Sequence, residues 1–162
     1  MLKVIAVEDG SAESGWLPRV SLGTLVLRYD ERHVRRRALT LPSGDRILLD
    51  LPEPVVLAAG EQLLLEDGTV VNIQAADEAL LEVTAKSPLH LTELAWHIGN
   101  RHLAAAIYPD RILIALDHVI TRMLEGLGAA VREVSEPFTP VRGAYGGSAS
   151  AGGHAHIHGH VS

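Results

Sequence analysis

The first half of the chain alternates short apolar runs with turn residues, a pattern typical of β-strands. Strands are predicted at residues 2–7, 23–28, 36–41, 46–51, 63–65 and 69–73. Turn signals separate them, including Pro42-Ser43-Gly44, Pro52-Glu53-Pro54 and Glu66-Asp67-Gly68. The last of these favours a tight hairpin, because Asp-Gly tolerates the positive φ of the turn. Residues 1–76 are therefore predicted to form a small all-β domain.

Helical spacing begins after residue 77. The first apolar face comprises Leu91, Leu94, Ala95 and Ile98, at i, i+3, i+4 and i+7. Ser87 can cap this helix, with Pro88 at its first position. Asp117 can cap a second helix that stops near Gly128. The apolar stripe of that helix comprises Ile120, Met123, Leu124 and Leu127. Strands predicted at 79–83, 104–107, 112–116 and 131–134 complete the order βαββαβ, that of a ferredoxin-like split βαβ sandwich.

Residues 143–162 are mostly Gly, Ser, Ala and His. Such a segment buries too little apolar surface to offset the entropy of ordering, so it is expected to be disordered without metal. The predicted fold class is α+β. It consists of a small N-terminal all-β domain (1–76), a ferredoxin-like βαββαβ domain (77–142) and a flexible histidine-bearing tail (143–162).

Composition narrows the functional classes. Hydrophobic residues make up 47% of the 162 residues, enough for a real core, and the formal net charge is −6. A nucleic-acid partner is not expected, because it requires a basic footprint. A membrane is not expected either, since no apolar run approaches the roughly 20 residues of a span. Residues 1–7 are too short for a signal peptide, and the chain has no cysteine, so a cytoplasmic location is expected.

The histidines indicate metal binding through imidazole. Four of them alternate with other residues near the C-terminus: His154, His156, His158 and His160. Alternate residues of an extended chain face the same side, so these rings can converge on one ion after bending. An expression tag is the other interpretation, although tags are usually uninterrupted histidine runs. Without cysteine, the site suits Ni²⁺, Cu²⁺ or Zn²⁺.

Three further histidines are candidates. His102 lies four residues after Ile98 and is expected to continue the apolar helix face, either as a core histidine or as a ligand. One imidazole holds a divalent ion poorly, but a two-fold axis through that face would supply a second His102. His118 follows the Asp117 cap, and its structural and ligand roles stay open. His97 is expected on the polar side of the first helix, as a solvated position.

A run of three arginines, Arg35-Arg36-Arg37, stands out in the first half. Phosphate binding is one interpretation. Alternating β-structure would divide these residues between two faces, and the chain is acidic overall. A solvated strand or a partner-docking patch is therefore the expected role.

Taken together, these motifs resemble the UreE family of urease accessory proteins. The resemblance rests on His97-Ile98-Gly99-Asn100-Arg101-His102, on Asp117-His118-Val119 and on the histidine-bearing tail. It extends over essentially the whole chain through the arginine-rich strand, the hairpin at residues 66–68 and Pro137-Phe138. It implies a peptide-binding-like N-terminal domain and a homodimer through the ferredoxin-like domain. It also implies that His102 shares one nickel ion with its symmetry mate and that His118 is a peripheral ligand. Members with such a site carry another histidine where this chain has Leu116.

The resemblance implies a nickel metallochaperone that binds Ni²⁺ and delivers it for assembly of the urease metallocentre. Its partners would be urease apoprotein and urease accessory proteins including a GTPase. The alternatives are a passive metal buffer or storage protein and a metal-dependent hydrolase. A hydrolase needs three fixed ligands and a general base, and the chain has no His-Glu-x-x-His motif, so we do not expect an enzyme. Cu²⁺ and Zn²⁺ are expected to bind the same imidazoles in vitro.

Overall fold

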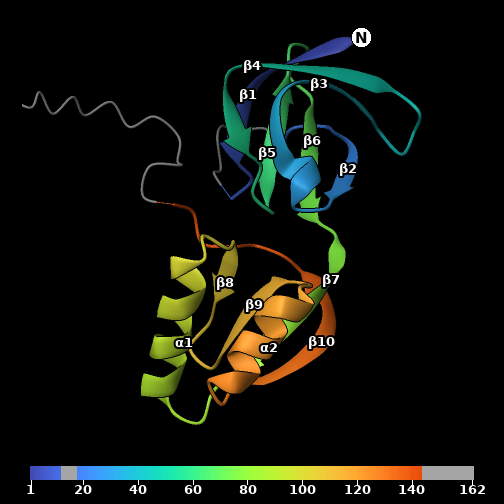
Figure 1. Ribbon diagram of the computed structural model, residues 1–162. Coiled ribbons are helices and arrows are strands. Elements are labelled where there is room, and N and C mark those ends of the chain that lie inside the picture. Colours follow the sequence, from blue (N-terminus) through green and yellow to red (C-terminus); the bar gives the residue numbers. More distant parts are fainter. Residues whose placement is uncertain (12–17, 144–162) are drawn as a thin grey trace, which may run out of the picture.

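The computed structural model describes residues 1–11 and 18–143, and this part of the chain forms two β-sheets and two α-helices (Figure 1). The first sheet uses strands between residues 2 and 75, and the second sheet and both helices use residues 77–137. The predicted α+β class is thereby confirmed. The predicted disordered tail, with His154, His156, His158 and His160, falls almost entirely outside the described residues.

Six strands form the first sheet, in the order β2-β6-β5-β1-β4-β3. Their bounds are β1 Leu2–Asp9, β2 Ser21–Leu27, β3 His33–Thr40, β4 Arg46–Val56, β5 Glu61–Leu65 and β6 Val70–Ala75. The pairs β1–β4 and β2–β6 are parallel, and the other neighbours are antiparallel. All six predicted strands are present. A short 3-10 helix, η1 (Asp30–Arg32), leads into β3 and was not predicted.

The hairpin between β5 and β6 has the predicted turn. Gly68 adopts a φ of +85°, and the N–H of Leu65 donates to the carbonyl oxygen of Thr69 at 2.9 Å. The side chain of Asp67 also accepts from the N–H of Thr69, at 3.0 Å, and so stabilises the same turn. The Asp-Gly prediction is confirmed because the signal is local to the turn.

The predicted turn at Pro52-Glu53-Pro54 is wrong, because β4 continues through these residues to Val56. Its pairing with β3 shifts register between Val34 and Arg36 and then resumes, with Val34 opposite Val55. The prolines occupy the irregular stretch, where no ladder hydrogen bond from their nitrogen is needed. A proline pair therefore marks a bulge here rather than the end of a strand.

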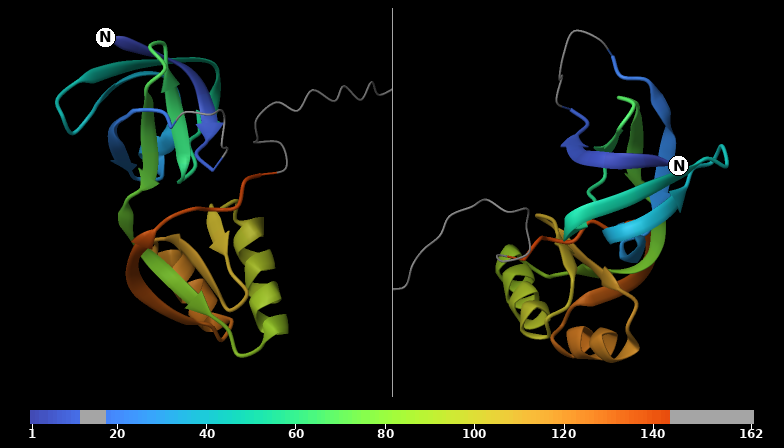
Figure 2. Two further views of the ribbon diagram at one scale, coloured as in Figure 1. Left: turned by 180° about the vertical axis from the view of Figure 1, so that it is seen from behind. Right: turned by 90° about the horizontal axis from the view of Figure 1, so that it is seen from above.

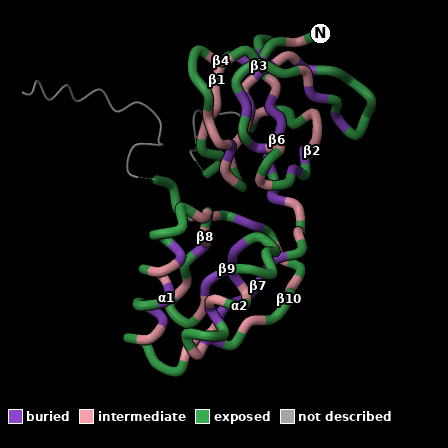
Figure 3. The backbone as a smooth tube through the Cα atoms, viewed as in Figure 1, coloured by how far each residue is buried: buried purple, intermediate pink, exposed green. Residues whose placement is uncertain are grey.

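Four antiparallel strands form the second sheet, in the order β10-β7-β9-β8. Along the chain the elements are β7 Asp77–Thr84, α1 Pro88–Asn100, β8 Ala105–Ile107, β9 Arg111–Ala115, α2 His118–Gly126 and β10 Ala130–Pro137. This is the predicted βαββαβ order. Both helices contribute to one core with the same sheet face, and buried positions follow β7 and β9 as well as the helices (Figure 3).

Both helices begin at the predicted caps, and their predicted apolar faces pack against the sheet. Ser87 accepts from the N–H of His90 at 3.1 Å, and Asp117 caps α2. Residues from both helices pack against the strands, namely Leu91, Leu94, Ile98, Ile120 and Leu124 against Leu81, Val83, Ile112 and Ile114. Leu127 departs from the predicted stripe and is 38% exposed, because α2 already ends at Gly126. Neither helix in the described ranges has both the length and the apolar character to cross a membrane.

A third apolar cluster joins the two sheets. Phe138 is buried in it together with Leu80 and Leu113 of the second sheet, and Tyr29 of the first half packs against it. After β10, residues 138–143 cross back over the second sheet (Figures 1 and 2); we call this segment the strap. The N–H of Val141 in the strap donates to the carbonyl oxygen of Ala105 in β8 at 2.8 Å.

Candidate metal centre

His102 lies two residues beyond the end of α1. The helix ends at Asn100 with Arg101 as its cap, and the backbone N–H of His102 donates to the carbonyl oxygen of Gly99 at 3.0 Å. The φ of His102 is +57°, a left-handed conformation that ends helices and that histidine adopts more readily than most residues. The predicted continuation of the apolar face is therefore wrong, and so is the core interpretation. His102 is exposed, and its imidazole is accessible to an ion.

An apolar hollow of about 150 Å³ opens beside His102. Its lining comprises Ala95, Ile98, Gly99, Leu103, Ala104, Ala105, Ile107, Ile112 and Val141. Ile107 and Val141 are 52% and 63% exposed, and Trp96 on α1 is 64% exposed. The end of α1 therefore presents an accessible imidazole within a surface that leaves large apolar side chains in water.

The strap brings the chain to the hollow beside His102. Val141 lines the hollow together with Gly99 and Leu103, the residues that lie three before and one after His102. Gly143, the last described residue, follows Val141 by only two positions. The histidine-bearing segment therefore starts close to His102, although the positions of its own histidines lie outside the described residues.

His118 is the first residue of α2 and is exposed. Asp117, the cap of α2, uses Oδ1 to accept from the N–H groups of Val119 and Ile120 at 2.9 and 3.0 Å. Arg122, one helical turn after His118, is also exposed. A helix N-terminus and a nearby guanidinium both disfavour a cation. His118 is thus an accessible but electrostatically unfavourable single ligand.

Two other histidines are engaged elsewhere. The Nδ1 atom of His90 accepts from the N–H of Lys86 at 3.0 Å, and its Nε2 lies 2.8 Å from the carbonyl oxygen of Leu127. These partners require a neutral ring with the proton on Nε2 and leave no nitrogen for a metal. His97 is half-buried and meets the ring of Trp96 edge-on, 5.1 Å between centroids. It is therefore less solvated than predicted.

Within residues 1–11 and 18–143, no three His, Asp or Glu side chains converge as a metal-binding group. This part of the chain therefore offers His102 and His118 as separate ligands and does not bring them together. Transition-metal sites usually combine three or four protein ligands. A site on His102 with that many protein ligands consequently takes them from outside the described residues or from a second chain.

The main ion-pair cluster lies on the helix-free face of the second sheet and involves no histidine. Glu82 is buried and accepts from Arg132 at 2.7 Å and from Arg111 at 2.9 Å. The hydrogen bond from Arg132 lowers the pKa of Glu82, and burial partly opposes this effect. Arg111 also bonds Glu136 at 2.8 Å and lowers the pKa of that carboxyl. Arginines neutralise both carboxylates, so the cluster, which sequence reasoning missed, does not suit a metal.

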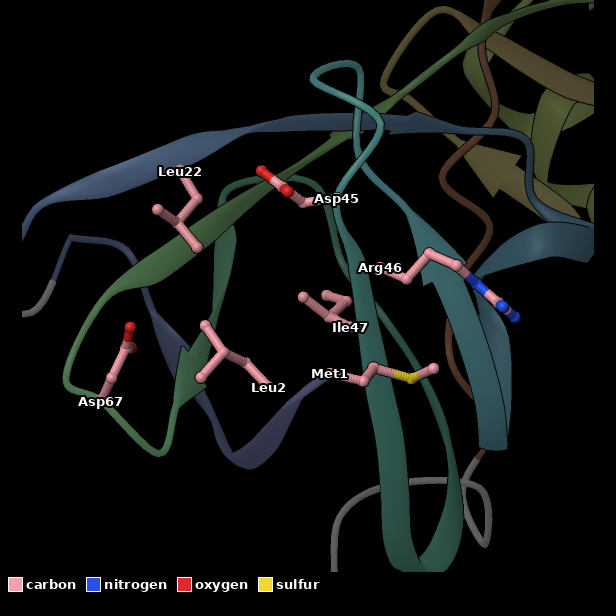
Figure 4. A pocket seen from close by; sticks show the side chains of 7 residues that line it. All are labelled: Met1, Leu2, Leu22, Asp45, Arg46, Ile47 and Asp67. Atoms are coloured by element: carbon pink, nitrogen blue, oxygen red, sulfur yellow. The ribbon is translucent and has the colours of Figure 1, made fainter.

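A larger hollow of about 550 Å³ lies in the first sheet, beside the start of β1 (Figure 4). Its lining comprises Met1, Leu2, Leu22, Asp45, Arg46, Ile47 and Asp67. It contains two carboxylates and no histidine, a donor set that does not favour the transition metals expected from the sequence.

Comparison with known proteins gives matches along nearly the whole chain. The family model described as "UreE urease accessory protein, N-terminal domain" matches residues 7–76. The model described as "UreE urease accessory protein, C-terminal domain" matches residues 78–161.

Relatives bearing one shared description match over most of their length. "Urease accessory protein UreE" of Mesorhizobium japonicum is 60% identical over 137 residues, which are 85% of this chain and 69% of the relative. The protein of the same description from Brucella anthropi is 54% identical over 137 residues, 85% of this chain and 78% of the relative. That from Agrobacterium fabrum is 55% identical over 134 residues, 83% and 81% of the two chains.

Proposed function

The chain belongs to the UreE family of urease accessory proteins, and we propose that it is a nickel metallochaperone for urease maturation. It binds Ni²⁺ as cargo and delivers it for assembly of the urease metallocentre. The observation that carries the proposal is the position of His102. Its exposed imidazole is held in a left-handed turn at the end of α1, next to the point where the histidine-bearing segment begins.

We propose that the working unit is a homodimer formed through the end of α1. A lone imidazole is too weak a site, and a two-fold axis passing near His102 supplies the second one. Ile107 and Val141, which line the hollow beside this position, and Trp96 on α1 are exposed apolar side chains, and a second copy covering them removes that surface from water. The shared nickel ion then lies between two His102 side chains.

The tail histidines complete this site in our proposal. His154, His156, His158 and His160 follow Gly143 by 11 to 17 residues, and an extended chain gains at most about 3.3–3.6 Å per residue. The segment is long enough to return to the end of the strap beside His102. His118 serves at most as a peripheral ligand, because its surroundings disfavour a cation.

The proposed division of labour follows the two sheets. Residues 77–142 act as a ferredoxin-like metal-binding and dimerisation domain. Its sheet order β10-β7-β9-β8 corresponds to the fourth, first, third and second strands of the βαββαβ unit, which is consistent with the split βαβ arrangement. Residues 1–76 act as a partner-binding β domain, and residues 143–162 as the histidine-bearing tail.

The proposed role involves no covalent chemistry and no enzyme activity. The partners are urease apoprotein and urease accessory proteins including a GTPase, in the cytoplasm. Exposed imidazoles can dissociate from a metal one at a time, unlike the ligands of a closed structural site, which suits transfer. Cu²⁺ and Zn²⁺ also bind in vitro, since imidazole does not exclude them.

Nickel transfer to urease apoprotein tests the proposal. The purified chain is loaded with Ni²⁺, passed over a desalting column and mixed with urease apoprotein and its accessory proteins, and urease activity is measured with time. Activation that depends on loaded chain and is lost with His102→Asn supports a metallochaperone. Tight nickel binding without activation indicates the buffer or storage alternative. Metal-dependent amide or ester hydrolysis by the chain alone would indicate the hydrolase.

A further inference from the structure

Five exposed basic side chains gather on three neighbouring strands of the first sheet. They are Lys3 on β1, Arg35, Arg36 and Arg37 on β3, and Arg46 on β4; we call them the basic strip. The strands β1, β4 and β3 are consecutive in the sheet, and β3 is its edge. A chain with a formal charge of −6 therefore carries a local surface of the opposite sign.

Strand register places most of the strip on one face. Lys3 and Ala38 both lie opposite Leu48 of β4. Residues two apart on a strand share a face, so Arg46 and Arg36 lie on the same face as Lys3. The other face of these strands carries the buried core of the first sheet, so this face points to solvent.

Arg36 and Arg37 divide between the two faces, as expected from the sequence. Arg36 pairs with Asp50 and Arg37 with Leu49. All three arginines nevertheless reach solvent, because β3 has no neighbour beyond it and its register shifts between Val34 and Arg36. The division between faces therefore does not disperse the charge.

Little of this charge is neutralised within the described residues. Asp50 is the one carboxylate there that lies within 4.0 Å of a strip side chain, at 4.0 Å from Arg36. The two side chains are 76% and 54% exposed, and such an exposed pair contributes little. Arg46 extends away from the apolar residues that line the neighbouring hollow (Figure 4).

Apolar surface lies among these charges. Ile5, two residues along β1 from Lys3, is 61% exposed, and Leu48 between Lys3 and Ala38 is half-buried. Protein interfaces combine a small apolar centre with a polar rim. Nucleic-acid surfaces instead require a broad positive footprint, which a chain of net charge −6 does not provide beyond the strip.

We propose that the basic strip, with Ile5 and Leu48 at its centre, is the docking surface for an acidic protein partner. The partner we commit to is the assembly of urease apoprotein with its accessory proteins, so the inference rests on the proposed function and deepens it. Complementary charge brings the partners together quickly and fixes their orientation. Docking through the first sheet leaves His102, just beyond the end of α1, free to release its ion.

The test compares two charge-reversal variants with equal change in net charge. One is R36E/R46E on the docking face of the strip, and the other is K86E/R122E, at two exposed positions, one just before α1 and one within α2. Binding of each full-length protein to the purified assembly of urease apoprotein and accessory proteins is measured by calorimetry. Measurements run from about 0.05 to 0.3 M NaCl, a range over which screening increases. Nickel affinity is measured on the same samples.

The proposal expects R36E/R46E to weaken binding by about tenfold or more, and K86E/R122E to change it by less than about threefold. Wild-type binding weakens with salt, and R36E/R46E has a flatter salt dependence. Equal binding by wild type and R36E/R46E, or wild-type binding that does not depend on salt, overturns the proposal. So does the absence of any binding by the wild type, or binding of a single-stranded oligonucleotide in place of the protein assembly.

The variant R36T/R46T distinguishes docking from a protective role of the strip. Charged side chains on an exposed edge strand keep copies of a protein from pairing. If R36T/R46T self-associates in light scattering but binds the assembly as wild type does, the strip is protective and the docking proposal fails. Nickel affinity distinguishes a failure of the proposed function from a failure of the docking proposal. A chain that docks but binds no nickel contradicts the proposed function, whereas loss of docking with intact nickel binding implicates the strip alone.

Discussion

Arg32 donates a hydrogen bond from Nη2 to the carbonyl oxygen of Phe138, 106 residues further along the chain. Arg32 lies in η1 of the first half and is 2% exposed, and Phe138 begins the strap. A second, longer bond runs from Nη1 to the carbonyl oxygen of Leu57 at 3.4 Å. Burial lowers the pKa of Arg32, and the nearby Glu78 carboxylate partly restores it. One buried guanidinium therefore ties the two sheets together.

Replacement of Arg32 by Met should destabilise the whole molecule. Met fills similar space but leaves the carbonyl oxygens of Leu57 and Phe138 without these donors. An unsatisfied buried acceptor costs about 1–3 kcal/mol, so we expect a loss of that order in the free energy of unfolding, measured in urea. Arg35→Met, on the exposed part of β3, is the control and should stay within about 0.5 kcal/mol. Equal effects of the two substitutions would contradict a tie between the sheets.

Stability should fall with acid through Glu82. Its pKa is lowered in the folded state from an ordinary value of 4.5 by hydrogen bonds from Arg132 and Arg111. Unfolded chains therefore take up a proton first as the pH drops below about 4.5, so the stabilisation is present above that pH and is lost below it. Glu82→Gln should lower stability at pH 7 and flatten the pH dependence between about pH 5 and 3. Glu133→Gln, on the neighbouring strand β10 and exposed, should leave the curve of urea midpoint against pH unchanged.

Replacement of His102 by Asn should remove the tightest nickel site and spare the fold. Asn tolerates the left-handed backbone at this position, and the exposed imidazole makes no packing contact that the core needs. Calorimetry with Ni²⁺ should show loss of the tight event, while the melting temperature stays within a few degrees. A matching loss of circular dichroism signal would mean that His102 is structural.

His90→Gln should have the opposite effects. His90 joins Lys86 at the start of α1 to Leu127 at the end of α2 through both ring nitrogens. Losing one or both bonds should cost about 1–2 kcal/mol of unfolding free energy. Nickel affinity should not change, because neither nitrogen is available to an ion. A change in nickel stoichiometry would place His90 among the ligands.

Deletion of residues 144–162 should lower the number of nickel ions bound per chain and leave the melting temperature unchanged. Binding by the intact chain should also weaken as the pH falls through about 6.5, because only neutral imidazole ligates a metal. Both are measured by nickel titration between about pH 7.5 and 5.5. An affinity that stays constant over this range would mean that histidine is not the principal ligand.

Local signals account for what could be predicted. Ser87, Pro88 and Asp117 act within one turn of their own helix, and Gly68 acts within its hairpin, so their roles can be read from neighbouring residues. The His97–His102 motif likewise identified the family and the region of the candidate site. The orientation of His102 could not be inferred from periodicity, because the helix stops two residues before it.

Long-range pairing accounts for what could not be predicted. The parallel pairs β1–β4 and β2–β6 join segments that are far apart in the chain. Pro52 and Pro54 look like a strand end unless the pairing of Val34 with Val55 beyond them is known. The burial of Arg32 depends on Phe138 and Leu57, neither of which is near it in the sequence. The tail histidines could be predicted as candidate ligands, but no pattern in the sequence says which of them would meet His102.

The bond from Arg32 to Phe138 also sets an order of events during synthesis. All six strands of the first sheet precede residue 76, so this sheet is translated well before its arginine's partner exists. At roughly 5–20 residues per second, 106 residues correspond to about 5–20 s of elongation. Through that interval the guanidinium of Arg32 must remain hydrated at an open surface. The strap therefore packs last. The contact between the two sheets forms only after the strap, which leads to the histidine-bearing segment, has left the ribosome.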